Sequence, residues 1–314
     1  MREEEKSDQE PCATGIEALS IATLDVALSD HFRLTLQDIT VPEGARLCIV
    51  GHNGAGKSCL LEYLAGIRRA PTARIRIFCH TPDELNAHPQ LRRSMGVQLQ
   101  RTCYPGDLTI RHVVALHGAL YGDIDKSVGP SLGITELMSS CYGALSRGQR
   151  QRVDLYMALA HRPKLAFLDE PTSTLDSHYA NQLVRLLSVE QKQTVIMTSH
   201  SDIEVAASTW ILWLSRGRSL GFGRRDALVS SAVGKYKGEI RFAHSDDAIR
   251  CADMVAKRTA PRVLRIVENR TVRLYTDGPV QPIVDDYLSV AEYYAFGRVT
   301  YSDFLSVAAL GESP

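Results

Sequence analysis

The residues best suited to chemistry form a glycine-rich run, GHNGAGKS, at positions 51–58. The run fits the pattern G-x-x-x-x-G-K-[ST], in which a tight turn aims successive backbone N–H groups at phosphate oxygens. Lys57 would reach the β- and γ-phosphates of a nucleotide, and the Ser58 hydroxyl would bind Mg²⁺. The run predicts an ATP site, to which we assign Gly51, His52, Asn53, Gly54, Ala55, Gly56, Lys57, Ser58 and Cys59.

A second candidate is the sequence LAFLDEP at positions 165–171. Four apolar residues predict a buried strand, and two acids follow at its end. Asp169 would hold Mg²⁺ through its water shell, and Glu170 would orient the attacking water as a general base. An acidic turn after a strand is the competing interpretation, and the phosphate loop makes it the weaker one.

The elements needed to position these residues can be predicted from hydrophobic runs. Arg46–Val50 predicts a buried strand before the phosphate loop, and SCLLEYLAGIRR predicts a helix after it. Further strands are expected at 164–168, Thr194–Thr198 and 211–214, each followed by polar residues. Ligands of a parallel sheet bind at these strand ends, so an α/β fold is expected.

The domain boundaries follow from changes in composition. Residues 1–18 predict a disordered acidic tail, residues 19–228 the α/β domain, and about 86–161 an inserted helical subdomain with helices at Ile110–Tyr121 and 150–160. After a small, polar stretch at 227–238, residues 238–314 predict a ferredoxin-like α+β domain of order β-α-β-β-α-β. Its elements are expected as strands at 239–243, 262–267, 271–275 and 298–301, and helices at 245–257, 284–296 and 303–310.

Composition narrows the class of protein. Lys plus Arg equals Asp plus Glu at 36 each, so no basic surplus indicates nucleic acid as a partner. The seven cysteines include no C-x-x-C pair, which favours reduced thiols over a zinc or redox site. No apolar run approaches the roughly 18 residues of a membrane span.

From about residue 19 to 225 the chain resembles the ABC ATPases. GHNGAGKS looks like Walker A and LAFLDEP like Walker B, while LSRGQRQRV at 145–153 resembles the ABC signature. Gln100 is placed like the Q-loop glutamine, residues 173–176 (STLD) look like the D-loop, and His200 resembles the switch histidine. The phosphate-loop NTPase fold and ATP hydrolysis are what this resemblance implies.

The resemblance also implies roles and partners. Gln100 would sense the γ-phosphate or Mg²⁺, and His200 would hydrogen-bond the γ-phosphate. Ser146, Gly148, Gln149 and Asp176 would serve the nucleotide shared with a second cassette. A homodimer or heterodimer of cassettes would drive a separate transmembrane permease from the cytoplasmic face of the membrane.

Three departures from the family pattern bear on these roles. Arg147 replaces the usual glycine of the signature, although Gly148 is retained. The stretch from 121 to 145 is shorter than usual, so the docking surface is open to question. The aromatic that stacks on adenine is not obvious: Leu28 lies near its position, and Phe32 and His31 are close by.

The direction of transport is predicted from two looser likenesses. The stretch 104–122 (YPGDLTIRHVVALHGALYG) and the tail AFGRVTYSDFLSVAAL resemble bacterial exporter ATPases, so export is the first expectation. An importer subunit is the main alternative. A soluble ABC ATPase of translation or repair is disfavoured by the single cassette and neutral charge, and a non-enzymatic subunit by the Asp169-Glu170 pair.

Overall fold

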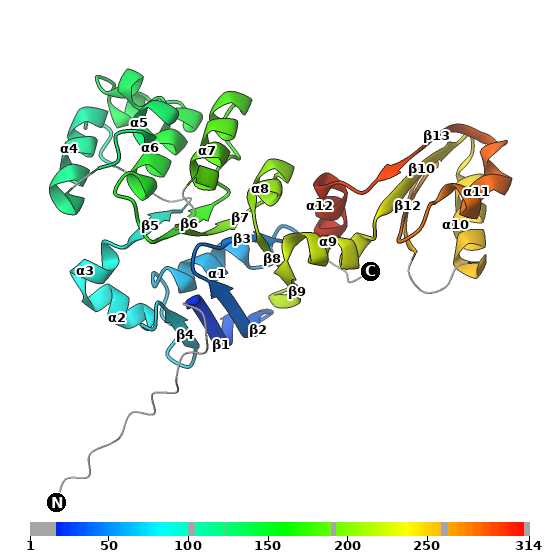
Figure 1. Ribbon diagram of the computed structural model, residues 1–314, viewed down its shortest axis with the longest axis horizontal. Coiled ribbons are helices and arrows are strands. Elements are labelled where there is room, and N and C mark those ends of the chain that lie inside the picture. The colour runs from blue at the N-terminus through cyan, green and yellow to red at the C-terminus, as the bar shows by residue number, and fades with distance from the viewer. Residues whose placement is uncertain (1–16, 100–103, 123, 190–192, 259–262, 311–314) are drawn as a thin grey trace, which may run out of the picture. The chain divides into compact units, whose positions relative to one another are not determined.

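The computed structural model describes residues 17–99, 104–122, 124–189, 193–258 and 263–310 (Figure 1). The chain divides into two compact units. The first contains the described residues up to Leu47 together with Ser58–Met197, and the second contains Cys48–Lys57 and the described residues from Thr198 onward. Within the described ranges, no helix is long and apolar enough to cross a membrane.

A nine-stranded sheet has the strand order β4-β1-β2-β9-β8-β3-β7-β6-β5. β1 pairs antiparallel with β2 and with β4, β8 pairs antiparallel with β9, and β5 runs parallel to β6. The strands are β1 (Glu17–Ser29), β2 (Phe32–Pro42), β3 (Arg46–Val50), β4 (Arg74–Ile77), β5 (Met95–Gln98), β6 (Leu165–Asp169), β7 (Thr194–Thr198), β8 (Trp210–Ser215) and β9 (Arg218–Arg224).

The central strands are buried along almost their whole length, as their apolar runs predict. Every residue of β6 and β7 is buried, and so are the last four residues of β3. Buried parallel strands read as continuous hydrophobic runs because helices cover both faces of the sheet. The strands predicted at Arg46–Val50 and Thr194–Thr198 therefore have their predicted bounds.

The helix predicted at Ile110–Tyr121 has its predicted bounds, and the one predicted at 150–160 corresponds to a helix at Arg147–Leu159. The described helices of the first unit are α1 (Lys57–Leu64), α2 (Pro82–Ala87), α3 (Pro89–Arg92), α4 (Ile110–Tyr121), α5 (Val128–Ser131), η1 (Thr135–Leu137), η2 (Tyr142–Ala144), α6 (Arg147–Leu159) and α7 (Ser177–Val189). The helical subdomain predicted at about 86–161 also contains the short strand β5. A methyl group at Gly96 would lie 1.9 Å from the Ala158 carbonyl oxygen, so this short strand depends on close contact with α6.

The N-terminal boundary also differs from the prediction. β1 begins at Glu17, two residues before the expected start of the α/β domain. Glu17 pairs with Pro42 and Leu19 with Val41, so pairing with β2 orders Glu17 and Ala18. Residues 1–16 of the predicted acidic tail lie outside the described residues.

The second unit contains a four-stranded antiparallel sheet with the order β11-β12-β10-β13. Figure 1 shows α10 and α11 beside this sheet, and the two helices contact each other. Ile240, Phe242, Val272 and Leu274 form its buried core with apolar residues of these helices. The remaining elements are α8 (Asp202–Ala207), α9 (Arg225–Val233), β10 (Tyr236–Phe242), α10 (Ser245–Arg258), β11 (Leu264–Glu268), β12 (Thr271–Thr276), α11 (Gln281–Leu288), β13 (Ala291–Arg298) and α12 (Tyr301–Leu310).

Two C-terminal predictions are wrong. The helix expected at 284–296 ends at Leu288, and the strand expected at 298–301 is β13, at Ala291–Arg298. Its sequence AEYYAFGR is rich in aromatic residues, which favour strands. Tyr294 of β13 pairs with Ile240 of β10, and this pairing between distant segments makes the sequence a strand in place of the predicted helix.

A buried aromatic contact helps to anchor α12 within its unit. Phe304 is fully buried, and its ring meets the ring of Trp213 edge-on with centroids 5.7 Å apart. α12 also contacts α8 and α9. Packing around Phe304 therefore contributes to holding the last helix in the second unit.

Phe304→Ala should lower the free energy of unfolding of this unit by about 3–5 kcal/mol, because it leaves a cavity beside Trp213. Both tryptophans, Trp210 and Trp213, lie in the second unit, so urea unfolding followed by tryptophan fluorescence measures the change. Leu310→Ala, at a side chain that is 55% exposed, is the control and should stay within about 0.5 kcal/mol. Equal losses in the two variants would contradict this packing.

Candidate functional site

The glycine-rich run forms a tight loop between β3 and α1. Gly51, Gly54 and Gly56 all have positive φ values, of 151°, 81° and 100°. A methyl group at Gly51 would lie only 2.0 Å from the Leu214 carbonyl oxygen at the end of β8. Only glycine fits there, so the loop is packed against the backbone of β8 within the second unit.

Lys57 lies inside this loop. Its Nζ donates hydrogen bonds to the Gly51 carbonyl at 2.9 Å and to the His52 carbonyl at 3.1 Å. The residue is only 6% exposed. An ammonium group held in a turn of backbone N–H groups, at the start of α1, is an arrangement that binds phosphate.

The other residues assigned to the phosphate site differ in their contacts and in their exposure to solvent. His52 accepts a hydrogen bond at Nε2 from the Arg216 N–H at 3.3 Å, and the Ala55 carbonyl accepts one from the Gly217 N–H at 3.0 Å. Asn53 is exposed, while Cys59 lies half-buried in α1. Burial raises the pKa of the Cys59 thiol, which keeps it protonated and argues for a packing role.

Ser58 and Asp169 lie together in the first unit. The Ser58 hydroxyl donates a hydrogen bond of 3.1 Å to Asp169 Oδ1, and Asp169 is only 3% exposed. A hydroxyl oxygen and a carboxylate oxygen at this spacing are the hard ligands that Mg²⁺ prefers. Among the described residues, no group of three or more His, Cys, Asp or Glu side chains is placed to hold a metal. The pair therefore fits an ion that is also bound by nucleotide phosphates and water.

Gln98 is a positioning residue that the sequence analysis missed. It ends β5, is 2% exposed, and its Oε1 accepts a hydrogen bond from the Asp169 N–H at 3.2 Å. Its Nε2 donates to the Asp169 carbonyl at 3.4 Å. The amide thus holds the Asp169 peptide on both sides. The signal available in the sequence was a polar residue at the end of an apolar strand, β5, which lies beside β6.

The two residues predicted to act on the γ-phosphate lie just beyond strand ends. Glu170 follows β6 with a positive φ of 47°, a conformation that is costly for a residue with a side chain. His200 follows β7 and is exposed. The Ser199 N–H beside it donates to the Ile49 carbonyl of β3, which fixes this turn to the strand before the phosphate loop. Gln100 lies outside the described residues.

The signature-like segment forms the N-terminus of α6. Ser146 is its N-cap: Ser146 Oγ accepts from the Gln149 N–H at 3.3 Å, and Gln149 Oε1 accepts from the Ser146 N–H at 2.9 Å. Ser146 and Arg147 are both exposed. This reciprocal capping box leaves the first N–H groups of a helix at the surface, where they can receive an anion.

Gly148 and Asp176 have contacts within their own chain that the sequence analysis did not predict. A methyl group at Gly148 would lie 2.7 Å from the Thr174 carbonyl oxygen, so this glycine allows α6 to approach the segment after β6. Asp176 Oδ1 accepts from the Tyr179 N–H at 3.0 Å at the start of α7. Each residue therefore has a structural role beside the predicted nucleotide role.

The residues considered for adenine stacking lie around one hairpin. Leu28 is near the end of β1, Phe32 begins β2, and His31 is in the turn between them. Phe32 is half-buried and His31 is exposed. No contact distinguishes them, so the assignment stays a prediction.

Replacing Gly51 with alanine should weaken ATP binding at least about tenfold, because the methyl group must displace either β8 or the loop. Gly54→Ala is the matched control, since nothing lies within 4 Å of the added methyl group. The only expected effect of Gly54→Ala is strain in the left-handed backbone at that residue, which should cost about 1–2 kcal/mol of folding free energy. Titration with a fluorescent ATP analogue measures both variants. Equal affinity in Gly51→Ala and the parent would contradict the close contact with Leu214.

Comparison with known proteins gives one consistent family. A family model described as "ABC transporter" matches residues 34–173. The chain is 32% identical over 203 residues to the thiamine import ATP-binding protein ThiQ of Shigella sonnei, covering 61% of this chain and 86% of the relative. It is 33% identical over 203 residues to the energy-coupling factor transporter ATP-binding protein EcfA1 of Mycoplasma pneumoniae, covering 61% and 73%.

A longer match covers four fifths of the chain. The molybdenum import ATP-binding protein ModC of Aromatoleum aromaticum is 29% identical over 268 residues, covering 80% of this chain and 68% of the relative. Among solved structures, an ATP-binding subunit of an ABC transporter aligns with a TM-score of 0.59 at 21% identity, covering 68% and 92%. This likeness shows the α/β fold of the cassette. The chain, with its phosphate loop and the Ser58–Asp169 pair, belongs to the ABC transporter ATP-binding proteins and is an ATPase.

Proposed function

We propose that this chain hydrolyses ATP to drive import through a separate membrane-spanning permease, and that it acts as a dimer of cassettes. The observation that supports hydrolysis best is the Ser58–Asp169 hydrogen bond, with Glu170 directly after Asp169. The support for import comes from relatives: ThiQ and ModC are both named as import ATP-binding proteins. The first expectation, export, is replaced because the relatives fit import better.

The residues divide the work at the nucleotide. Lys57 and the N–H groups of 51–58 bind the phosphates, and Ser58 and Asp169 hold Mg²⁺. The ion, when bound, neutralises charge on the phosphate oxygens. Glu170 accepts a proton from the attacking water, and His200 and Gln100 orient the γ-phosphate and its ion.

The second cassette supplies the signature surface to the same nucleotide. The exposed hydroxyl of Ser146 and the first N–H groups of α6 face the γ-phosphate of the partner, next to Gly148 and Gln149. Asp176 lies in the turn that joins the two cassettes. ATP closes the dimer by binding the closed state better than the open one, which moves the permease helices.

The C-terminal part is a ferredoxin-like accessory domain. Its element order is β10-α10-β11-β12-α11-β13 with the sheet order β11-β12-β10-β13, which is that of a split β-α-β arrangement. The permease holds the whole chain at the cytoplasmic face of the membrane. Nucleic acid is not a partner.

Glu170→Gln should lower steady-state ATP turnover at least about a hundredfold while leaving ATP affinity within about threefold, because the amide cannot accept the proton of the attacking water. Phosphate release measures turnover, and titration with a fluorescent ATP analogue measures affinity. Glu136→Gln, at an exposed site in η1, is the control and should keep parental turnover. Parental turnover in Glu170→Gln would exclude this residue as the base.

The direction of transport can be tested without knowing the cargo. A strain carrying Lys57→Ala loses phosphate binding, so an importer's cargo should fall inside the cells and remain in the medium. Untargeted metabolite profiles of cells and medium, compared with the parent and with a strain restored by the wild-type chain, measure this. A solute that instead accumulates inside the cells of the variant would return the assignment to export.

A further inference from the structure

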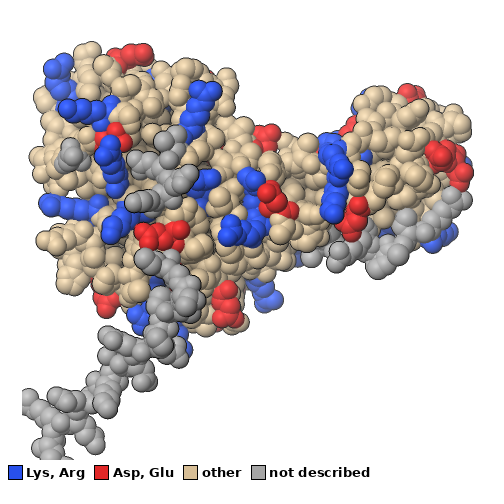
Figure 2. Space-filling model, viewed as in Figure 1, with Lys and Arg blue, Asp and Glu red and all other residues tan. Residues whose placement is uncertain are grey.

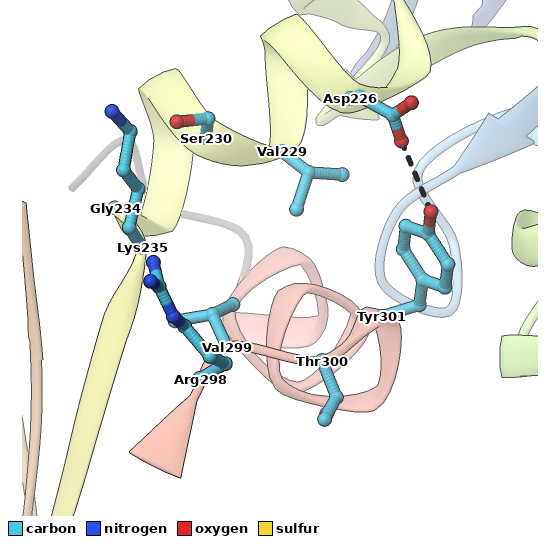
Figure 3. Close-up of a pocket in the computed structure, with 9 residues that line it drawn as sticks. All are labelled: Asp226, Val229, Ser230, Gly234, Lys235, Arg298, Val299, Thr300 and Tyr301. Carbon is cyan, nitrogen blue, oxygen red and sulfur yellow. Dashed lines mark hydrogen bonds between the residues drawn. The ribbon is translucent and has the colours of Figure 1, made fainter.

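A cavity of about 460 Å³ lies within the second unit, and none of its lining residues is assigned to the nucleotide (Figure 3). It is formed by α9, the two residues between α9 and β10, the end of β13 and the start of α12. Small-molecule sites typically have volumes of about 300–1,000 Å³. The cavity is thus large enough for a small organic ligand.

Two cationic side chains, Lys235 and Arg298, line one end of the cavity. Figure 3 shows them on the same side of the cavity as the Ser230 hydroxyl. The Arg298 guanidinium lies over the Tyr236 ring at 4.3 Å from its centroid, which restricts its movement. Within the described part of the chain, neither Lys235 nor Arg298 forms an ion pair with a carboxylate.

The backbone beneath these cations is fixed. The Lys235 N–H donates to the Thr276 carbonyl at 2.8 Å, and the Lys235 carbonyl accepts from the Val299 N–H at 3.2 Å. Gly234 has a φ of 75°, and a methyl group there would lie 2.5 Å from the Thr276 carbonyl oxygen. Gly234 therefore cannot carry a side chain, and its backbone is held close to the end of β12.

The one carboxylate among the lining residues, Asp226, is already paired with an arginine. Asp226 receives hydrogen bonds from Arg225 Nε at 2.8 Å and Nη2 at 3.2 Å, and from the Tyr301 hydroxyl at 3.0 Å. The Arg225 hydrogen bond lowers the pKa of the Asp226 carboxyl, so its charge is paired with Arg225. The Asp226–Tyr301 hydrogen bond lies at the other end of the cavity in Figure 3. A surplus of two positive charges remains at the Lys235 end.

Apolar surface lies between the two ends. Val229 of α9 is buried, and Val299 is half-buried where β13 leads into α12. Figure 3 shows both side chains between the cationic end and the Tyr301 ring. Bare inorganic phosphate would leave this surface unused, whereas a molecule with an acidic head and an apolar body would cover it.

We propose that this cavity binds a small organic anion, whose carboxylate, sulfonate or phosphate head lies between Lys235 and Arg298 and whose apolar body packs on Val229 and Val299. The guanidinium offers a planar pair of donors and the ammonium a point charge, which together suit an oxyanion head. This site is separate from the ATP site and does not depend on the direction of transport.

The probe for the full-length chain is 8-anilinonaphthalene-1-sulfonate, whose fluorescence rises on binding to an apolar site. Binding should be saturable and should weaken at least tenfold in the double variant Lys235→Gln/Arg298→Gln. Arg241→Gln is the matched control, because its guanidinium also lies over a tyrosine ring in the same sheet, Tyr293, at 5.9 Å, yet does not line the cavity. Octanoate should displace the probe, and octylamine should not.

Equal probe affinity in the double variant and in Arg241→Gln would overturn the proposal. So would displacement by octylamine as effective as by octanoate, or by inorganic phosphate as effective as by octanoate. Preference for anionic lipid vesicles over octanoate would overturn the assignment to a free small molecule. If the double variant fails to fold, Lys235→Gln alone decides, because that side chain is exposed: a threefold or greater loss supports the site, and unchanged affinity excludes it.

Discussion

The Lys57 ammonium group lies almost out of contact with water, and two carbonyl groups of its own loop hold it there. Burying a charge is costly unless hydrogen bonds compensate, so the loop must bring its carbonyls within 3.1 Å of the amine. Gly51 allows that turn because it has no side chain to collide with the nearby Leu214 carbonyl. The phosphate site therefore depends on the exact course of β3 and β8.

In the first unit, hydrogen bonds to the backbone hold the predicted magnesium-binding residue Asp169 in place. Asp169 ends a fully buried strand, and its peptide is held by Gln98 of the neighbouring strand β5. The register of β5 against β6, with Gln98 opposite Leu168, brings that amide to the strand end. Glu170 then leaves the sheet with a positive φ. Strained backbone conformations of this kind cluster at functional sites, where the direction of the side chain is needed for the chemistry.

Close backbone contacts also define the signature-like segment. Gly148 brings the N-terminus of α6 against Thr174, while the Ser146–Gln149 capping box orders the first turn. The same residues therefore have two tasks, since they shape their own subunit and present an anion-binding helix end. Arg147 is exposed beside them and is compatible with both.

Much of this arrangement can be predicted from the sequence, because the phosphate loop and the strands beside it have short-range signals. The bounds of β3, β7 and α4 follow from apolar runs and helical spacing. Long-range contacts decided the rest: β5 depends on Gly96 against Ala158, and β13 on pairing with β10. The roles of Gln98 and of Gly148 toward Thr174 likewise appear only once distant segments meet. Export was predicted from loose likenesses, whereas the relatives found by comparison include import ATP-binding proteins, which is why import is the direction that we propose.

The most direct test of the central claim is to recover the tagged chain from detergent-solubilised native membranes and identify the proteins that come with it. The account predicts a multi-spanning membrane protein in stoichiometric amount, retained by a Glu170→Gln chain in the presence of ATP. Recovery of ribosomes or DNA-repair proteins in place of a membrane partner would contradict it and would assign the chain to the soluble ABC ATPases.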